Sequence, residues 1–346
     1  MNISMGINLQ SGPWGGGNQA LGVLAEYLRG KGVNVSFDLK NADLDIIVLT
    51  EPREFLRSSA YTDKDIIHYL RKINRETIVI HRVNECDERK GTAGVNQRLR
   101  RANLCADHTV FVSEWLRDLQ LSNGFVCDSY SVILNGSDGR LFHPIGYQRW
   151  DMKGPMKLMT HHWGSNWMKG FDIYGRLDEL LKTKPFEHQI SFTYVGNLPK
   201  GFLFQNAIYI EPKHGVQLAS LIRQHHIYLT ASQNEPGANH PNEGANCGLP
   251  LLYRESGCLP EYCTGYGISF TEEYFEESLS EMMTRYHDLA DRMKSYPHTA
   301  ERMCENYYHL FVKLLDKREE LFKKRRWWRR PGWLFRDYGR ALLNHN

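Results

Sequence analysis

Short apolar runs alternate with amphipathic stretches along the first part of the chain. Four runs have the length and composition of strands: 44–50, 76–81, 109–112 and 130–134. Three segments between them carry apolar residues at helical spacing: 63–73, 96–103 and 113–121. Strands that alternate with helices in this way form a parallel sheet covered by helices on both faces. The pattern therefore predicts a doubly wound α/β domain.

The same alternation restarts after residues 135–155, where turn residues dominate and an interdomain linker is expected. The expected strands of the second part are 156–160, 190–195, 207–210, 227–230 and 249–253. Helices are expected from about 169, at 216–223 and within 272–318. A chain of 346 residues also exceeds one comfortable core. We expect two Rossmann-like domains whose sheets place their carboxyl ends across one crevice, where ligands of such sheets bind.

Composition and cysteine usage limit the class of protein. With 41% hydrophobic and 24% charged residues, the sequence is typical of a soluble globular protein, and no apolar run approaches the ~18 residues of a membrane span. The amino-terminal residues lack the order of a signal peptide. Seven cysteines are scattered without a Cys-x-x-Cys pair, and no metal-ligand cluster is visible. We expect a reduced, cytoplasmic location, with neither a metal nor a cofactor.

The carboxyl-terminal segment 321–346 differs in charge from the rest. It contains eight Lys or Arg residues against one Asp, a net charge of +7, whereas the whole chain carries +3. The remainder is therefore net negative and offers no general basic surface for nucleic acid. Trp327, Trp328 and Trp333 are interleaved with the basic residues. Two interpretations stay open: peripheral contact with an anionic membrane, or packing of the tryptophans on the first domain.

Two carboxylates eight residues apart, Glu235 and Glu243, lie between two expected strands. Pro241 suits the first turn of a short helix capped by Asn239 or His240, which places Glu243 near the helix start. Free amides and the helix dipole favour an anionic ligand there, and a carboxylate beside it can accept hydrogen bonds from a sugar diol. Taken alone, the pair is equally well explained as a helix-start residue and a solvated loop charge.

Several further motifs occur in a fixed order. They are the glycine-rich loop Gly12–Gly17, the segments 111–116, 132–138 and 142–144, the lysine-glycine segment 167–174, the strand end 194–197, and Glu235-x7-Glu243 followed by Gly248, Pro250, Gly257 and Glu261. Together they resemble the retaining GT-B glycosyltransferases of family 4, over residues 10 to about 265. In that family the last helix commonly crosses back to the first domain. The resemblance assigns 1–145 to an acceptor-side domain, 146–300 to a donor domain, and 301–346 to a crossing helix and tail.

The resemblance implies transfer of a sugar from a nucleoside diphosphate sugar to a glycan or other hydroxyl acceptor, with retained configuration and without a metal. Glu235 would bind the hydroxyls of the donor sugar, Lys169 its phosphate and Glu243 the ribose. Preorganised donors stabilise the charge that grows on the leaving diphosphate. The other residues expected at the donor site are Gly15, Gly16, Gly17, Ser165, Asn166, Gly196, Gly237, Ala238 and Asn239. We expect a GDP-linked sugar such as GDP-mannose in preference to a UDP-linked one.

A histidine close to the transferred sugar is the second element that the resemblance implies. The strand 76–81 ends in His81, which we take as catalytic. Polar residues follow it, and Arg82, Asn84 and Asp87 are the acceptor-side candidates. The alternative is that His81 caps the sheet and that Arg82 pairs with Asp87.

One position departs from the family. An arginine usually stands about six residues before the lysine, and here that position is Trp163. Ser165 and Asn166 lie in the same loop and can donate to the phosphate, though more weakly than a guanidinium. The departure leaves open a second hypothesis, a non-catalytic protein that binds nucleotide sugars or glycans. A Rossmann oxidoreductase is disfavoured because the first loop lacks Gly-x-Gly-x-x-Gly.

Overall fold

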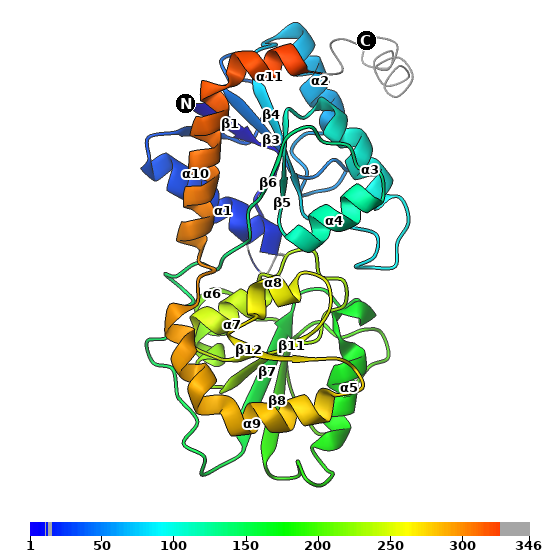
Figure 1. Ribbon diagram of the computed structural model, residues 1–346, viewed down its shortest axis with the longest axis vertical. Helices are drawn as coiled ribbons and strands as arrows, with labels where there is room; N and C mark the ends of the chain where they lie inside the picture. The colour runs from blue at the N-terminus through cyan, green and yellow to red at the C-terminus, as the bar shows by residue number, and fades with distance from the viewer. Residues whose placement is uncertain (11, 13–15, 326–346) are drawn as a thin grey trace.

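The computed structural model describes residues 1–10, 12 and 16–325, which form two domains stacked along the long axis of the molecule (Figure 1). The first domain contains a six-stranded parallel sheet in the order β2-β1-β3-β4-β5-β6. Its strands are β1 (Asn2–Met5), β2 (Asn34–Ser36), β3 (Ile46–Leu49), β4 (Ile78–Val83), β5 (His108–Phe111) and β6 (Tyr130–Val132). Its helices are α1 (Gly16–Gly30), α2 (Asp63–Lys72), α3 (Val95–Ala102) and α4 (Glu114–Ser122).

Both faces of this sheet are buried, so neighbouring residues of one strand enter different cores. Ile78 and Ile80 of β4 pack with α1, whereas Val79 between them packs with α2. Side chains of a strand alternate between the two faces, and helices on both faces make a continuous apolar strand possible. This alternation decides where the polar residues at the end of β4 point.

The second domain contains another six-stranded parallel sheet, in the order β12-β11-β10-β7-β8-β9. Its strands are β7 (Met156–His162), β8 (Ile190–Gly196), β9 (Ile208–Ile210), β10 (Ile227–Thr230), β11 (Leu251–Arg254) and β12 (Gly267–Phe270). Its helices are the short η2 (Trp167–Lys169), α5 (Phe171–Leu180), α6 (Gly215–Ile222), α7 (His240–Asn246), α8 (Leu259–Cys263) and α9 (Phe275–Arg292). The sequence pattern did not predict β12, because this short edge strand begins with a glycine and has no extended apolar run.

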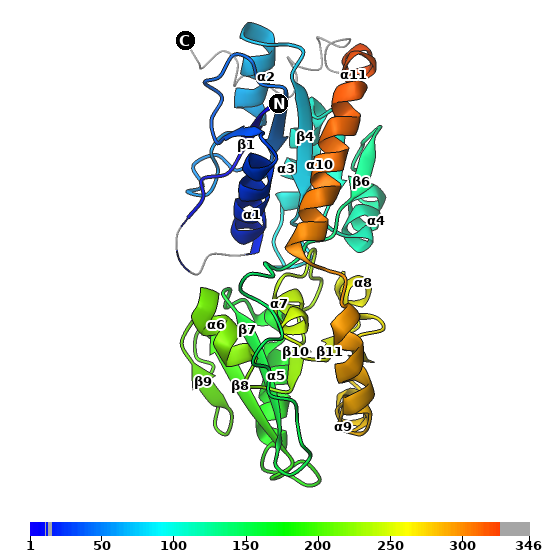
Figure 2. The same ribbon diagram turned by 90° about the vertical axis from the view of Figure 1, so that its left-hand side faces the viewer.

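The chain returns to the first domain after α9. Helix α10 (Ala300–Asp316) is capped by Thr299 and packs along α1, with Met303, Tyr307 and Phe311 in the core of the first domain (Figure 2). Helix α11 (Arg318–Lys324) follows, and the buried Arg325 pairs with Asp107 at 2.8 Å. Two doubly wound parallel sheets and a crossing helix were predicted, and the structure confirms them.

The second domain also contacts the first through α8. The Glu261 carboxylate accepts hydrogen bonds from the first amides of α4, those of Glu114 and Trp115, at 2.7 and 2.6 Å. Tyr262 donates its hydroxyl to the carbonyl of Val112 and accepts from the amide of Asn135. These contacts fix the helix start of one domain against the other beside the cleft.

Residues 326–346 of the basic segment 321–346, which include its three tryptophans, lie outside the described residues. Contact with an anionic membrane and packing of the tryptophans on the first domain therefore both stay predictions. Within 1–10, 12 and 16–325, no helix combines the length and apolar character needed to cross a membrane.

Candidate functional site

A cleft of about 490 Å³ lies between the domains, at the carboxyl ends of strands from both sheets. The residues of the first domain that line it and bear on its chemistry are Gly16, Gly17, Arg82, Asn84, Glu85, Arg89 and Lys90. Those of the second domain are His161, His162, Trp163, Asn166, Lys169, Gly196, Glu235, Gly237, Asn239, His240 and Glu243. The predicted crevice between two sheets therefore exists, and charged side chains from both domains line it.

The central pair of the cleft is Lys169 and Glu235. Lys169 ends η2, Glu235 follows β10, and the ammonium donates to the carboxylate at 2.6 Å. Only 3% of Glu235 is exposed. A buried carboxylate is tolerated only when it is paired. Both residues were predicted for the donor site from separate motifs, and the structure brings them together.

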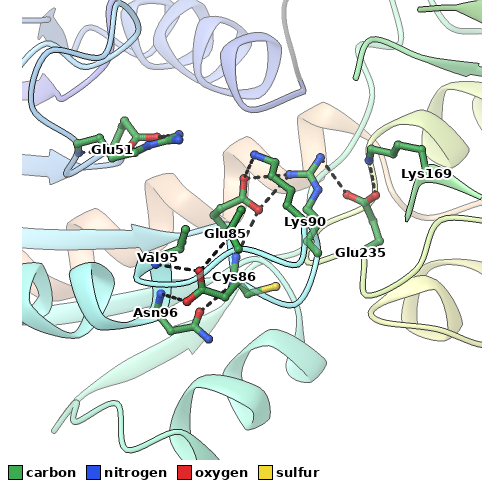
Figure 3. A network of polar contacts seen from close by, with 12 residues as sticks. Glu51, Glu85, Cys86, Lys90, Val95, Asn96, Lys169 and Glu235 are labelled. Carbon is green, nitrogen blue, oxygen red and sulfur yellow. Dashed lines mark hydrogen bonds and ion pairs between the residues drawn. The ribbon is translucent and has the colours of Figure 1, made fainter. Parts of the chain in front are cut away.

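Arg89 approaches the same carboxylate from the first domain. Its Nη2 lies 3.6 Å from Glu235 Oε1, while its Nη1 is 3.2 Å from Glu85 Oε2. Figure 3 shows Lys169 and Glu235 on one side of this network and Glu85 and Lys90 on the other. Burial alone would raise the pKa of the Glu235 carboxyl, but Arg89 and Lys169 lower it to about 2. Glu235 is therefore an ionised acceptor of hydrogen bonds at neutral pH.

Lys169 is under opposing influences. Burial and the nearby Arg89 lower the pKa of its ammonium, and Glu235 raises it in part. The lysine and the carboxylate thus depend on each other for their charged forms.

Glu243 lies in α7, which begins as the sequence predicted, with Asn239 as N-cap and Pro241 in the first turn. Its Oε2 is 2.7 Å from His161 Nε2. His161 Nδ1 is 2.8 Å from the hydroxyl of Tyr228. His161 therefore lies between the Glu243 carboxylate and the Tyr228 hydroxyl, and its contact with Glu243 is close in distance but is not aligned as a hydrogen bond. The side chain of Glu243 is thereby oriented, and it is 4% exposed.

Two further histidines of the second-domain wall are buried and neutral. The rings of His162 and His240 lie 4.7 Å apart. His162 Nε2 is 2.8 Å from the Tyr174 hydroxyl, and His240 Nε2 is 2.7 Å from that of Thr230. Burial, reinforced by Lys169 and the other histidines, holds the pKa of both rings well below its usual range. They support the wall without adding charge to it.

Glycines allow the two domains to approach closely at the cleft. A Cβ on Gly16, at the start of α1, would lie 1.9 Å from the side-chain amide of Asn239, so a larger residue there would force Asn239 to move. Within the second domain, Gly196 ends β8 at a φ of +145°. A Cβ there would lie 2.0 Å from the carbonyl oxygen of His162 on the neighbouring strand β7. Gly17 and Gly237 line the cleft as well. Gly15 lies outside the described residues, and Ala238 is buried beneath the surface of the cleft.

The loop that departs from the family is open to solvent. Trp163 is 44% exposed, and Ser165 is exposed without lining the cleft. Asn166 lines the cleft, and its Oδ1 accepts from the amide of Met168 at 2.9 Å. This loop therefore provides no cation at position 163, where the resemblance to family 4 implies an arginine.

The structure corrects the position of His81. Its side chain is completely buried, its Nδ1 is 3.0 Å from Asn103 Oδ1, and its ring stacks on Phe125. Arg82, the next residue of β4, points to the other face and lines the cleft. The strand expected at 76–81 is present as β4 at 78–83, but the pleat directs His81 toward Asn103, just after α3, and away from a ligand in the cleft.

The acceptor-side candidates Arg82, Asn84 and Asp87 also differ in whether they line the cleft. Arg82 is buried and donates to the Tyr307 hydroxyl and to Asn135, so its partners are not the Asp87 of the alternative interpretation. Asn84 lines the cleft. Asp87 does not; it accepts from the amides of Val95 and Asn96, each at 2.9 Å, and so holds the start of α3. Its role is structural.

Arg89 is the residue that the sequence-based site missed. The concentration of charge after a buried strand marked its loop, but nothing in the sequence selected this arginine among its charged neighbours. Its relevance comes from the second domain, because Glu235 is the residue that it reaches.

Comparison with known proteins gives the fold a name. No protein-family model matches the sequence, and no curated protein matches it. Sucrose-phosphate synthase from Thermosynechococcus elongatus has a similar structure, with a TM-score of 0.62 and 14% identity over 91% of this chain and 99% of that one. HepE from Anabaena in complex with UDP-glucose gives 0.64 and 15%, over 90% and 99%. The catalytic domain of starch synthase IV from Arabidopsis thaliana, bound to ADP and acarbose, gives 0.62 and 10%, over 91% and 99%. The chain therefore has the GT-B fold.

Proposed function

We propose that the protein is a glycosyltransferase that moves a sugar from a nucleoside diphosphate sugar to a glycan or other hydroxyl acceptor, with retention of configuration. The observation that carries the proposal is the buried pair of Lys169 and Glu235 in the cleft between two doubly wound domains. Three proteins of similar structure support it: two are named as synthases, and two are bound to UDP-glucose or to ADP.

The chemistry of this reaction fits the groups in the cleft. Negative charge grows on the diphosphate as it leaves, so preorganised positive groups lower the barrier. Lys169 supplies a point charge, and the first amides of α1 at Gly16 and Gly17 supply dipoles. Glu235, with its pKa near 2, remains ionised and accepts hydrogen bonds from sugar hydroxyls. Glu243, oriented by His161, does the same for the ribose diol.

The positive charge in this proposal comes from side chains, so the reaction proceeds without a divalent metal. Lys169 and Arg89 flank Glu235 on its two oxygens, where the diphosphate of a donor would lie beside the sugar. Activity is expected to be the same with and without a chelator. Loss of activity in EDTA, restored by magnesium or manganese, would contradict this part of the proposal.

The donor is identified by a panel of nucleotide sugars. GDP-mannose is the donor expected from the sequence. UDP-glucose and an ADP-linked sugar are the alternatives, because similar structures are bound to UDP-glucose and to ADP. A donor at ~100 times its dissociation constant stabilises the fold by ~2.7 kcal/mol, which a thermal-shift assay detects. The stabilising donor is then incubated with glycan acceptors, and release of the free nucleoside diphosphate is measured.

The second candidate is a binding protein without turnover, and Trp163 in place of the phosphate-site arginine is the observation that favours it. The same assay separates the two. Stabilisation by a nucleotide sugar with acceptor-dependent release of nucleoside diphosphate supports the transferase. Stabilisation without release, across the acceptor panel, supports the binding protein.

A further inference from the structure

A network of charged side chains crosses the cleft from one domain to the other (Figure 3). Lys169 contacts Glu235 at 2.6 Å within the second domain. Arg89 of the first domain connects Glu235 to Glu85, and Lys90 contacts Glu85 at 2.9 Å. Three cations thus share two carboxylates, so the network carries one positive charge in excess.

Arg89 has hydrogen-bond donors to spare at this crossing point. Its Nη1 donates to both oxygens of Glu85, at 3.3 and 3.2 Å. The 3.6 Å between Nη2 and Glu235 is an ion pair and is too long for a good hydrogen bond. Its Nε is buried and has no hydrogen-bond partner among residues 1–10, 12 and 16–325. This buried Nε is out of reach of the cleft, whereas the Arg89 side chain as a whole is 24% exposed and lines the cleft, so the donor capacity left for a ligand is that of Nη2.

The second domain lacks a cation at the corresponding place. The loop before Lys169 carries Trp163, which is 44% exposed, where a guanidinium is expected for a diphosphate. Lys169 binds one oxygen of Glu235 and Arg89 faces the other, so both cations border the space beside this carboxylate. A guanidinium suits this position because it contacts two phosphate oxygens at once.

We propose that Arg89 is the second cation for the donor diphosphate, supplied by the acceptor-side domain in place of an arginine at position 163. The inference rests on the proposed function and deepens it. Because Lys169 and Arg89 belong to different domains, a diphosphate that contacts both ties the domains together. The phosphate site is then complete only when the two walls of the cleft face each other as they do here.

The test is R89A, with affinity measured by calorimetry for UDP, GDP, ADP and inorganic pyrophosphate, and for UMP, GMP and AMP. Diphosphate and pyrophosphate affinity is expected to fall about 10- to 100-fold, as for one lost hydrogen bond to a charged group. Monophosphate affinity is expected to change by less than about threefold, because the base and ribose contacts remain. R98A is the matched control: Arg98 lies in α3, outside the cleft, and its loss is expected to change neither affinity.

A rescue variant separates phosphate binding from a general effect on the fold. R89A/W163R returns a guanidinium to the second domain and is expected to recover most of the diphosphate affinity. R89K keeps the ion pairs with Glu85 and Glu235, and hence the fold, but loses bidentate binding, so an intermediate affinity is expected.

Three results overturn the inference: equal losses for mono- and diphosphates in R89A, no loss in R89A or R89K, or no recovery in R89A/W163R. If the wild-type protein binds none of UDP, GDP, ADP and pyrophosphate, the proposed function itself fails. If the wild type binds and R89A binds equally well, only the role of Arg89 fails.

Discussion

The second-domain wall of the cleft is held by contacts within its own domain, whereas the first-domain wall reaches its partner across the cleft. Lys169 is fixed by Glu235, and Glu243 by His161, all in the second domain. Arg89 of the first domain is fixed by Glu85 and by Glu235 of the other domain. A wall whose residues position one another within one domain can bind a nucleotide without the other domain. A wall whose residue is positioned by the other domain depends on how the two domains face each other. The second domain is therefore expected to carry most of the donor affinity, and the first to complete the phosphate site.

The largest expected effect is at the centre of the second-domain wall. K169A and E235Q are each expected to lower turnover at saturating donor by about 100-fold or more, because each removes an electrostatic contact that strengthens in the transition state. E235Q also leaves Lys169 and Arg89 facing a neutral group, so thermal stability is measured alongside. E276Q is the control, since Glu276 forms a partly exposed ion pair with Arg176, of a kind worth ~0–1 kcal/mol. Turnover close to that of the wild type in K169A or E235Q would remove that residue from the site.

The two walls also differ in how far the sequence predicts them. In the second domain, Lys169, Glu235 and Glu243 each follow a strand end within a local turn or helix start, and all three lie in the cleft. Local chemistry decides these positions: α7 starts after Asn239, Pro241 fits its first turn, and Glu243 follows within that turn. Residues whose place is set by neighbours in the sequence can be predicted from the sequence.

The first domain shows where such prediction stops. A strand ending in His81 was predicted and β4 continues to Val83, but with helices on both faces the sequence does not say which face meets the cleft. A shift of one residue exchanges the two side chains, and the structure puts Arg82 at the cleft and His81 against Asn103. Arg89 is a harder case, because its partner Glu235 is distant in the sequence and belongs to the other domain.

A smaller effect is expected at the ribose side of the second-domain wall. If Glu243 accepts hydrogen bonds from the ribose diol, the wild type prefers a nucleoside diphosphate over its 2′-deoxy form. E243Q is expected to weaken binding of the ribonucleotide roughly tenfold and to remove most of this preference, because one hydrogen bond to a charged group is weakened. Calorimetry with both nucleotides measures this. An unchanged preference in E243Q would place the ribose elsewhere along the wall.

The smallest effect on activity is expected at His81, which is buried in the first domain and does not line the cleft. H81N is expected to leave turnover and donor affinity close to those of the wild type, because the side chain lies outside the cleft. Its effect is on stability as a function of pH. Burial lowers the pKa of His81 to about 4, with partial compensation by its hydrogen bond to Asn103.

An unfolded histidine titrates near pH 6.5, so between about pH 6.5 and 4 the unfolded chain binds a proton at this position that the folded chain does not. The stability that neutral His81 contributes is present above pH 6.5 and is lost progressively as the pH falls toward 4. The destabilisation of H81N relative to the wild type is therefore expected to shrink by roughly 3 kcal/mol over that range. H188N is the control, because the side chain of His188 is 89% exposed and its loss is expected to leave the pH profile unchanged. Chemical denaturation at several pH values gives both profiles. A large loss of turnover in H81N with an unchanged pH profile would return this histidine to the cleft and reverse the assignment of the two faces of β4.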